Sequence, residues 1–237
     1  MTQTDNEMLS SQQHALLGDE LYHRIKSDIL SRKLEQGMPL NEALLGQHYA
    51  GSRTPVRQAL LRLQQEGFVE KSGRILCVRS FTFEAVRELY ELREALEKMT
   101  VRLCIERATN AELEALAQEL DTYDQFDLAV RREAFNRHAN GFHRSLARLA
   151  RNETLRRQLD HMLDLVLMVN ARWFLEGTVE GARQGHAVIL EAILQRDVTV
   201  AEAAMRTHII RITRLFAQQT LGIRHSEAAN IQPTALR

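Results

Sequence analysis

Residues 51–70, GSRTPVRQALLRLQQEGFVE, place a hydroxyl, an arginine and a proline directly ahead of a leucine-rich segment. Thr54 as N-cap and Pro55 at the first helical position predict a helix start, because a hydroxyl satisfies an orphan backbone N–H and proline's fixed φ suits that position. Gly67 is well placed to end the helix. One face of the helix is apolar and is expected to join a core; its residues are Val56, Ala59, Leu60 and Leu63.

The front end of this helix is basic. Arg53, Arg57 and Gln58 project away from the apolar face, at the end where backbone N–H groups also point outward. Guanidinium groups, a hydroxyl and the positive end of the helix dipole all attract phosphate. In helix-turn-helix proteins the start of the second helix meets base edges and phosphates, where arginine pairs with guanine and glutamine with adenine. The stretch therefore predicts a DNA-reading helix; the alternative is that these arginines are solvated surface charges.

The neighbouring segments complete a small domain around this helix. Residues 19–30 carry apolar side chains at helical spacing, and a short second helix is expected over about residues 42–49. Residues 68–78, FVEKSGRILCV, alternate like a hairpin with its bend at Ser72-Gly73. The basic residues that flank the bend, and that are expected to reach an adjacent DNA backbone, are Lys71 and Arg74.

Residues 37–70, GMPLNEALLGQHYAGSRTPVRQALLRLQQEGFVE, also resemble a known family. They look like the winged helix-turn-helix of the GntR family of bacterial transcription regulators, in which an SRTPVR-AL-RL-EG run is characteristic, and the resemblance covers about residues 19–79. One departure is visible, because the family usually has Gly-Val before the Ser-Arg-Thr whereas residues 49–51 read Tyr-Ala-Gly. The resemblance implies DNA contacts by Arg53, Thr54 and Arg57, with Gly73 at the wing tip.

Composition limits the class of protein. The chain has 237 residues, of which 44% are apolar and 26% charged, and its formal net charge is zero. A neutral chain is not expected to coat nucleic acid over its whole surface, but the basic residues between 53 and 79 form a local basic face. No run of about 20 apolar residues spans a membrane, and the N-terminus lacks a secretion signal, so a cytoplasmic protein is expected. Cys77 and Cys104 lack CxxC spacing and are expected to be buried thiols.

The expected fold is mainly α, in two domains. A winged helix-turn-helix of three helices and a β-hairpin is followed by an all-α bundle of six or seven helices. Capping boxes are expected at Thr109 to Glu112 and at Thr199 to Glu202, and Asn152 is a further candidate cap. The expected boundaries are a flexible tail over 1–16, the DNA-binding domain over 17–80, the helical domain over 83–221 and a second flexible tail over 222–237.

Three histidines in the second half have informative neighbours. The segments around His143, His186 and His208 resemble the C-terminal effector domain of the FadR branch of the GntR family, called FCD, over about residues 83–219. In many members a carboxylate and three histidines on separate helices hold a divalent metal, so these residues are implied ligands of a zinc or nickel ion, which imidazole suits. The family's acid lies four residues before the first histidine, where this chain has Ala139. Asn140 is the remaining candidate oxygen ligand; the alternative is a polar cavity without metal.

The resemblance also implies an effector, generally a small organic acid met by arginines. Arg93 matches an arginine of the family's first effector-domain helix, and Arg172 is a second candidate. The alternative for each is a surface ion pair with nearby glutamates.

Together these features predict a homodimeric, ligand-responsive transcription regulator that binds a palindromic operator. We expect it to act as a repressor that its effector releases from DNA. Two alternatives come from other classes. One is a metalloenzyme using the three histidines, although the chain has no HExxH motif and no evident general base beside His143. The other is a metal- or metabolite-binding protein whose DNA-binding half has decayed.

Overall fold

The computed structural model describes residues 3–121, 132–172 and 178–221. The chain divides into an N-terminal unit, residues 1–80, and a C-terminal unit, residues 81–237. None of the helices in the described residues is both long enough and apolar enough to cross a membrane.

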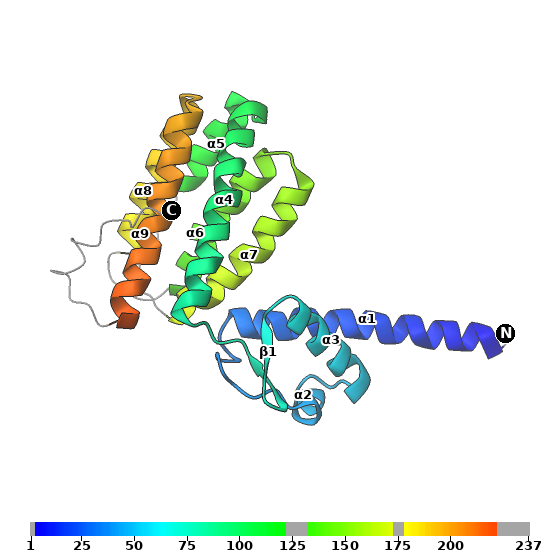
Figure 1. Ribbon diagram of the computed structural model, residues 1–237. Helices are drawn as coiled ribbons and strands as arrows, with labels where there is room; N and C mark the ends of the chain where they lie inside the picture. The colour runs from blue at the N-terminus through cyan, green and yellow to red at the C-terminus, as the bar shows by residue number, and fades with distance from the viewer. Residues whose placement is uncertain (1–2, 122–131, 173–177, 222–237) are drawn as a thin grey trace. The chain divides into compact units, whose positions relative to one another are not determined.

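The N-terminal unit has three helices and a hairpin (Figure 1): α1 (Gln3–Leu30), α2 (Glu42–His48), α3 (Arg53–Gln65), β1 (Val69–Ser72) and β2 (Ile75–Val78). The strands are antiparallel and pair Val69 with Val78 and Ser72 with Ile75, so Gly73 and Arg74 form the turn. Gly73 has a φ of 60°, which suits glycine in a two-residue hairpin turn. The winged helix-turn-helix is confirmed, and α1 begins further toward the N-terminus than expected; the flexibility of the tails stays a prediction.

The core of this unit explains the apolar face of α3. Val56, Leu60 and Leu63 are fully buried, together with Ile25 of α1 and Phe68 beyond α3. Helix α1 packs against α3, and α2 also packs against α3. The apolar stripe on α3 therefore lies against the core as predicted, which leaves the opposite face of α3 outside the core.

The two ends of α3 differ in how well the sequence predicted them. The helix starts at Arg53 with Ser52 as N-cap, so the prediction of Thr54 as cap and Pro55 as first residue was wrong. Pro55 is tolerated because all of the first four N–H groups of a helix lack intrahelical partners. At the other end Gly67 has a φ of 76°, and Phe68 N–H donates to the Leu63 carbonyl at 2.9 Å. This is the glycine-terminated helix end that the sequence predicted.

The C-terminal unit has six helices joined by short connections in its described residues, 81–121, 132–172 and 178–221. They are α4 (Phe83–Arg107), α5 (Asn110–Asp121), α6 (Arg132–Leu149), α7 (Glu153–Arg172), α8 (Thr178–Leu194) and α9 (Val198–Leu221). Helix α4 contacts α6, α7, α8 and α9, which places it at the centre of the bundle (Figure 1). The bundle predicted from the sequence is confirmed.

Caps fix where three of these helices begin. Thr109 and Glu112 form the expected capping box, in which Thr109 N–H donates to the Glu112 carboxylate at 2.8 Å. Asn152 accepts from the Leu155 N–H as predicted. The prediction of a second capping box at Thr199 was wrong, because Asp197 caps α9 by accepting the Val200 N–H at 2.9 Å.

Candidate nucleic-acid interface and metal centre

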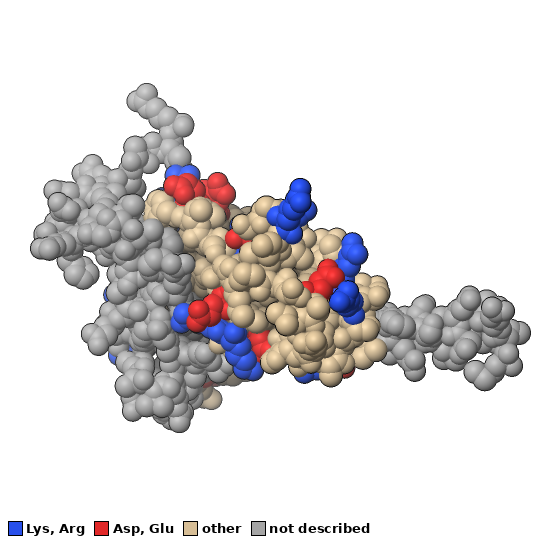
Figure 2. Space-filling model, turned by 90° about the horizontal axis from the view of Figure 1, so that it is seen from below, with Lys and Arg blue, Asp and Glu red and all other residues tan. Residues whose placement is uncertain are grey.

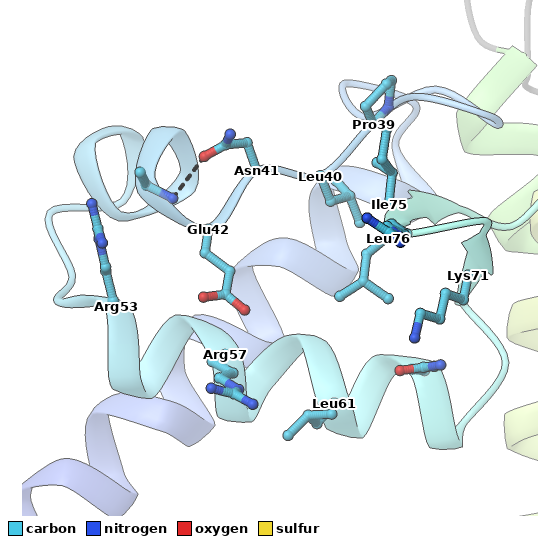
Figure 3. Close-up of a pocket in the computed structure, with 13 residues that line it drawn as sticks. Pro39, Leu40, Asn41, Glu42, Arg53, Arg57, Leu61, Lys71, Ile75 and Leu76 are labelled. Carbon is cyan, nitrogen blue, oxygen red and sulfur yellow. Dashed lines mark hydrogen bonds between the residues drawn. The ribbon is translucent and has the colours of Figure 1, made fainter.

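A groove of about 820 Å³ lies between α3, the start of α2 and the hairpin (Figure 3). Its basic lining comes from two elements: Arg53 and Arg57 lie one turn apart on α3, and the hairpin supplies the others. The basic side chains that line the groove are Arg53, Arg57, Lys71 and Arg74. The groove therefore gathers four of the seven predicted DNA-binding residues.

The start of α3 adds to the positive character of this groove. Arg53 is its first residue, so the positive end of the helix dipole lies at the groove. Ser52 makes no side-chain capping hydrogen bond to the described N–H groups of α3, whereas Asn41 caps α2 by accepting from Ala43 and Leu44 N–H. The backbone donors at the start of α3 thus lack a side-chain cap, the arrangement that binds phosphate at helix N-termini.

One carboxylate lines the groove as well. Figure 3 shows Glu42 extending from α2 toward α3, in the region of Arg53 and Arg57. A carboxylate repels phosphate but accepts a hydrogen bond from the amino group of cytosine. The groove thus combines cations for the DNA backbone with an acceptor suited to a base edge.

The other residues of α3 divide between the groove and α1. Leu61 and Gln64 line the groove, although the sequence did not single them out. Gln58 lies beside α1, because a Cβ added at Gly18 would come 3.2 Å from its Oε1 atom. Arg62 also faces α1 and forms an ion pair with Asp19 at 2.9 Å.

The remaining predicted contacts lie on the surface of the N-terminal unit. Thr54 is exposed on α3, and Gly73 forms the hairpin turn. Figure 2 shows one face of the chain, where basic and acidic side chains occur in small separate groups on a mostly uncharged surface.

The second site is a group of three buried histidines. His143 of α6, His186 of α8 and His208 of α9 each offer one nitrogen, and these nitrogens lie within 4.8 Å of one another. The Nε2 atoms of His143 and His186 are 3.2 Å apart. Gly185 makes room for this arrangement, because a Cβ there would collide with the imidazole of His208. The structure thus brings together three residues that are far apart in sequence.

Helix α4 contributes a buried ion pair to the same group. Arg93 Nε donates to Glu97 Oε1 at 2.6 Å, and both side chains are almost completely buried. Glu97 Oε2 also contacts Nδ1 of His143, and Arg93 Nη2 lies 2.9 Å from Nε2 of the same ring. With its proton on Nδ1, facing Glu97, His143 has its Nε2 lone pair directed toward Arg93.

Burial controls the charges of this group. Desolvation lowers the pKa of His186 and His208 well below the ordinary value, so both rings are neutral at pH 7. Burial alone would raise the pKa of Glu97, but His143 and Arg93 lower it to about 2. Glu97 is therefore ionised, and its charge offsets that of Arg93.

These residues fit a divalent metal ion. Neutral imidazoles present lone pairs, and two nitrogens that share one ion at about 2.0–2.1 Å each lie roughly 3–3.5 Å apart. Within the described part of the chain, Nε2 of His208 is buried and has no hydrogen-bond partner, which is costly unless a ligand meets it. Glu97 supplies the carboxylate–histidine contact that commonly orients a metal-binding imidazole.

Comparison with known proteins identifies both units. Residues 17–75 match the model of the gntR family of bacterial regulatory proteins, and residues 88–211 match the model of the FCD domain. The chain belongs to the GntR family and carries an FCD domain. It is a DNA-binding transcription regulator and not an enzyme, which excludes the metalloenzyme alternative.

Relatives of this GntR regulator agree with that assignment. The HTH-type regulator YdhC of Bacillus subtilis (strain 168) is 28% identical over 192 residues, which are 80% of this chain and 86% of YdhC. The repressor RspR of Escherichia coli (strain K12) is 24% identical over 207 residues, 85% of this chain and 90% of RspR. The structure of E. coli McbR/YncC has the same fold, with a TM-score of 0.72 at 19% identity and coverage of 86% and 98% of the two chains.

The FCD domain differs from the sequence predictions in two respects. Arg93 does pair with a glutamate, but the pair is buried at the histidine centre rather than on the surface. Glu97 was missed, although its place one turn after Arg93 on the same helix face was a usable signal. Asn140 is buried and its amide donates to the Leu163 carbonyl at 3.3 Å, so a role as ligand stays a prediction. The side chain of Arg172 lies outside the described residues.

Proposed function

We propose that this GntR regulator is a homodimeric cytoplasmic repressor that binds a palindromic operator and is released by a small carboxylate. The observation that carries the proposal is the buried centre of three neutral histidines and Arg93, which lies in a different unit from the basic groove. RspR, a relative by sequence, is named a repressor, which supports that direction of regulation.

The operator contact is assigned to the groove of the N-terminal unit. Arg53, Arg57, Lys71 and Arg74 bind phosphates or base edges. Thr54, exposed at the start of α3, is a further candidate, and Gln58 is a weaker one because it lies beside α1 outside the groove lining. In a two-fold dimer the N-terminal unit of each chain binds one half-site, so the symmetry of the operator follows the symmetry of the protein. This assignment rests on the basic lining of the groove and on the helix N-terminus that opens into it.

The metal proposal rests on the donor set. His143, His186 and His208 hold a divalent ion, with zinc and nickel the ions that imidazole suits. Such an ion supplies a Lewis-acidic position for a carboxylate oxygen. Glu97 keeps the proton of His143 on Nδ1 and so leaves Nε2 for coordination. The alternative, a polar cavity without metal, is favoured only if the purified chain proves metal-free.

Charge determines the class of effector. Arg93 and Glu97 cancel one another, so a divalent ion among neutral imidazoles leaves the buried centre with excess positive charge. An anion of small size restores the balance, which favours a carboxylate. When Nε2 of His143 serves as a ligand, Arg93 has an N–H available to the effector.

The experiment on regulation is a binding titration. Operator fragments are selected from a random DNA pool with the purified protein, and fluorescence anisotropy then measures affinity with and without a panel of small carboxylates. We expect one acid to weaken binding to the selected sequence while leaving a scrambled fragment unaffected. Tighter binding would reverse the proposed sign, and no preference for any sequence would contradict the operator proposal.

The experiment on the metal is elemental analysis of the purified protein. We expect close to one zinc or nickel ion per chain, and its loss in His186→Ala. His23→Ala is the matched control, because His23 is exposed on α1 in the other unit. A wild-type protein without metal, even after incubation with zinc and desalting, would favour the metal-free cavity.

A further inference from the structure

Helix α4 carries an exposed stripe on the side opposite its buried ion pair. The residues of this α4 stripe are spaced alternately by four and three positions, the spacing that keeps side chains on one side of a helix facing a partner helix. All of them are exposed; they are Glu88, Leu92, Ala95, Met99 and Arg102. Leu92 is 55% exposed and Met99 47%, although α4 is otherwise surrounded by other helices.

Exposure of two apolar side chains does not itself indicate a partner, since single exposed apolar residues are normal. The order of residues along the stripe is more informative. Leu92 precedes Ala95 by three residues and Met99 follows it by four. Glu88 precedes Ala95 by seven residues and Arg102 follows it by seven. The stripe therefore has its apolar residues near the centre and opposite charges at equal distances on the two sides.

The stripe is complementary to a second copy of itself that runs in the opposite direction. When two α4 helices lie antiparallel about a two-fold axis at Ala95, Leu92 meets Met99 of the second copy. Glu88 then faces Arg102 of the second copy, and symmetry produces both pairs twice. The small side chain at Ala95 lets the helix axes approach closely at the crossing point. An interface that matches the same surface patch on both subunits is what a two-fold dimer requires.

The surroundings of Arg102 hold it at the edge of this surface. Its guanidinium bonds Glu202 of α9 at 2.7 Å, and the Arg102 side chain is still 49% exposed. The exposed part has further N–H groups to offer to a carboxylate. Arg102 thus lies where Glu88 of a second copy would complete an ion-pair network around an apolar centre.

We propose that the chain forms its homodimer by antiparallel packing of two α4 stripes about an axis at Ala95. The occupant of the stripe is a second copy of this chain, chosen by the self-complementary order of charges and apolar residues. This inference rests on the proposed dimeric regulator and adds the surface through which the dimer forms.

The first test uses Ala95→Cys. A residue on the axis lies next to its own counterpart, within reach of the Cβ separation of about 3.5–4.5 Å that a disulfide needs. Mild oxidation should therefore give a covalent dimer on a non-reducing gel. Val188→Cys on α8 is the matched control, because Val188, like Ala95, is exposed but lies outside the α4 stripe. The unmodified chain should give no such band, since Cys77 and Cys104 are both buried.

The second test reverses charges. Glu88→Arg and Arg102→Glu should each weaken the dimer roughly tenfold, because each change puts like charges opposite one another twice. The double variant E88R/R102E should recover most of the loss, measured by sedimentation equilibrium. Recovery distinguishes a contact between copies from loss of the Arg102–Glu202 pair within one chain, which the double variant still lacks.

The outcomes separate this inference from the proposed function. A dimer that ignores charge reversal and does not cross-link at residue 95 has its interface elsewhere, and a monomer that still binds its operator also overturns the α4 proposal. A cross-linked α4 dimer without any DNA sequence preference leaves the inference standing and contradicts the proposed regulation instead.

Discussion

Two small residues, Ala50 and Gly51, form the turn between α2 and α3. Ala50 has a φ of 56°, in the left-handed region that favours glycine, directly after the C-cap of α2. Gly51, the next residue, is the glycine that the family resemblance places one position earlier. It approaches α1 closely, since an added Cβ would lie 2.9 Å from Cδ1 of Leu21. The turn therefore has its glycine where space is short, and an alanine where the backbone is strained.

Ala50→Gly is predicted to stabilise the protein by about 1 kcal/mol, because glycine adopts a left-handed conformation without the steric cost that alanine has. Urea denaturation measures the change. Gly51→Ala is the matched control and should destabilise, because its new methyl group meets Leu21. A less stable Ala50→Gly protein would contradict the prediction, because it would show that contacts of the Ala50 methyl group stabilise the fold by more than the strained backbone destabilises it.

Arg57 and Arg62 lie on the same helix but face different surroundings. Arg57→Ala is predicted to reduce operator affinity by about 1–3 kcal/mol, since its side chain lines the groove. Arg62→Ala should have little effect on DNA affinity, because Arg62 is held by Asp19 and Glu66 beside α1. Fluorescence anisotropy with the selected operator compares the two. Equal losses would show that α3 acts by general charge rather than by a specific face.

At the scale of elements, capping decides where helices begin, and short-range sequence patterns identify caps unevenly. The Thr109 box and Asn152 were predicted from the sequence, whereas Thr199 was assigned a role that belongs to Asp197. Glu202, the expected partner of Thr199, instead pairs with Arg102 of α4. A tertiary ion pair has thus taken the carboxylate that the local pattern assigned to a cap.

Asp197→Ala is predicted to cost about 1 kcal/mol of stability, the usual loss when an N-cap carboxylate is removed. Thr199→Ala should cost almost nothing, because Thr199 is exposed and is not the cap. Thermal denaturation followed by circular dichroism provides the comparison. A larger loss of stability in Thr199→Ala than in Asp197→Ala would show that Thr199 is the cap after all.

Tyr49, the C-cap of α2, joins that helix to α1 by donating its hydroxyl to Oδ2 of Asp28 at 2.6 Å. Burial alone would raise the pKa of Asp28, but the hydrogen bonds from Tyr49 and Lys33 outweigh it and lower the pKa. The pKa of Asp28 is lower in the folded protein than in the unfolded chain. The stabilisation from this hydrogen bond is therefore fully present above the unfolded pKa, near 4, and is lost as pH falls through the folded pKa.

Tyr49→Phe is therefore predicted to lower the free energy of unfolding by about 1 kcal/mol at pH 7, where the hydrogen bond has a charged acceptor. The difference between wild type and variant should shrink at acidic pH as Asp28 becomes protonated. Urea denaturation at pH 7 and at about pH 3 tests both points. A difference that stays constant with pH would show that the hydroxyl acts through packing alone.

At the scale of the whole molecule, the two units place their charged groups differently. The N-terminal unit presents cations at a groove on its surface, whereas the C-terminal unit buries Arg93, Glu97 and three histidines among its helices. Regulation requires that a ligand bind one state of the molecule better than another, because a ligand of equal affinity shifts no equilibrium. The buried centre is suited to this role, since an occupant contacts α6, α8 and α9 at once.

Zinc is predicted to raise the melting temperature of the protein, and EDTA to reverse the increase. At a free concentration 100 times the dissociation constant, the stabilisation amounts to about 2.7 kcal/mol. His208→Ala should abolish the shift, whereas His23→Ala should keep it. Differential scanning calorimetry measures the change, and a shift that persists in His208→Ala would place the zinc elsewhere.

The sequence by itself determined the local features. The apolar stripe of α3 predicted its buried face, Gly67 predicted its end, and the run at residues 51–70 predicted a basic helix start. These features depend on neighbours within one or two turns, so residue spacing is sufficient to identify them. The family resemblance supplied the three histidines, which spacing alone does not bring together.

Only the tertiary structure decided which distant groups meet. Glu97 became part of the histidine centre because α4 lies against α6 and turns its buried face toward His143. Gln58 and Arg62 turned toward α1, away from the groove, because α1 packs against that side of α3. A single sequence does not specify how far one helix is rotated against another, because that depends on how the whole core packs. The fold was therefore predictable from local patterns, whereas the charge balance of the buried centre was not.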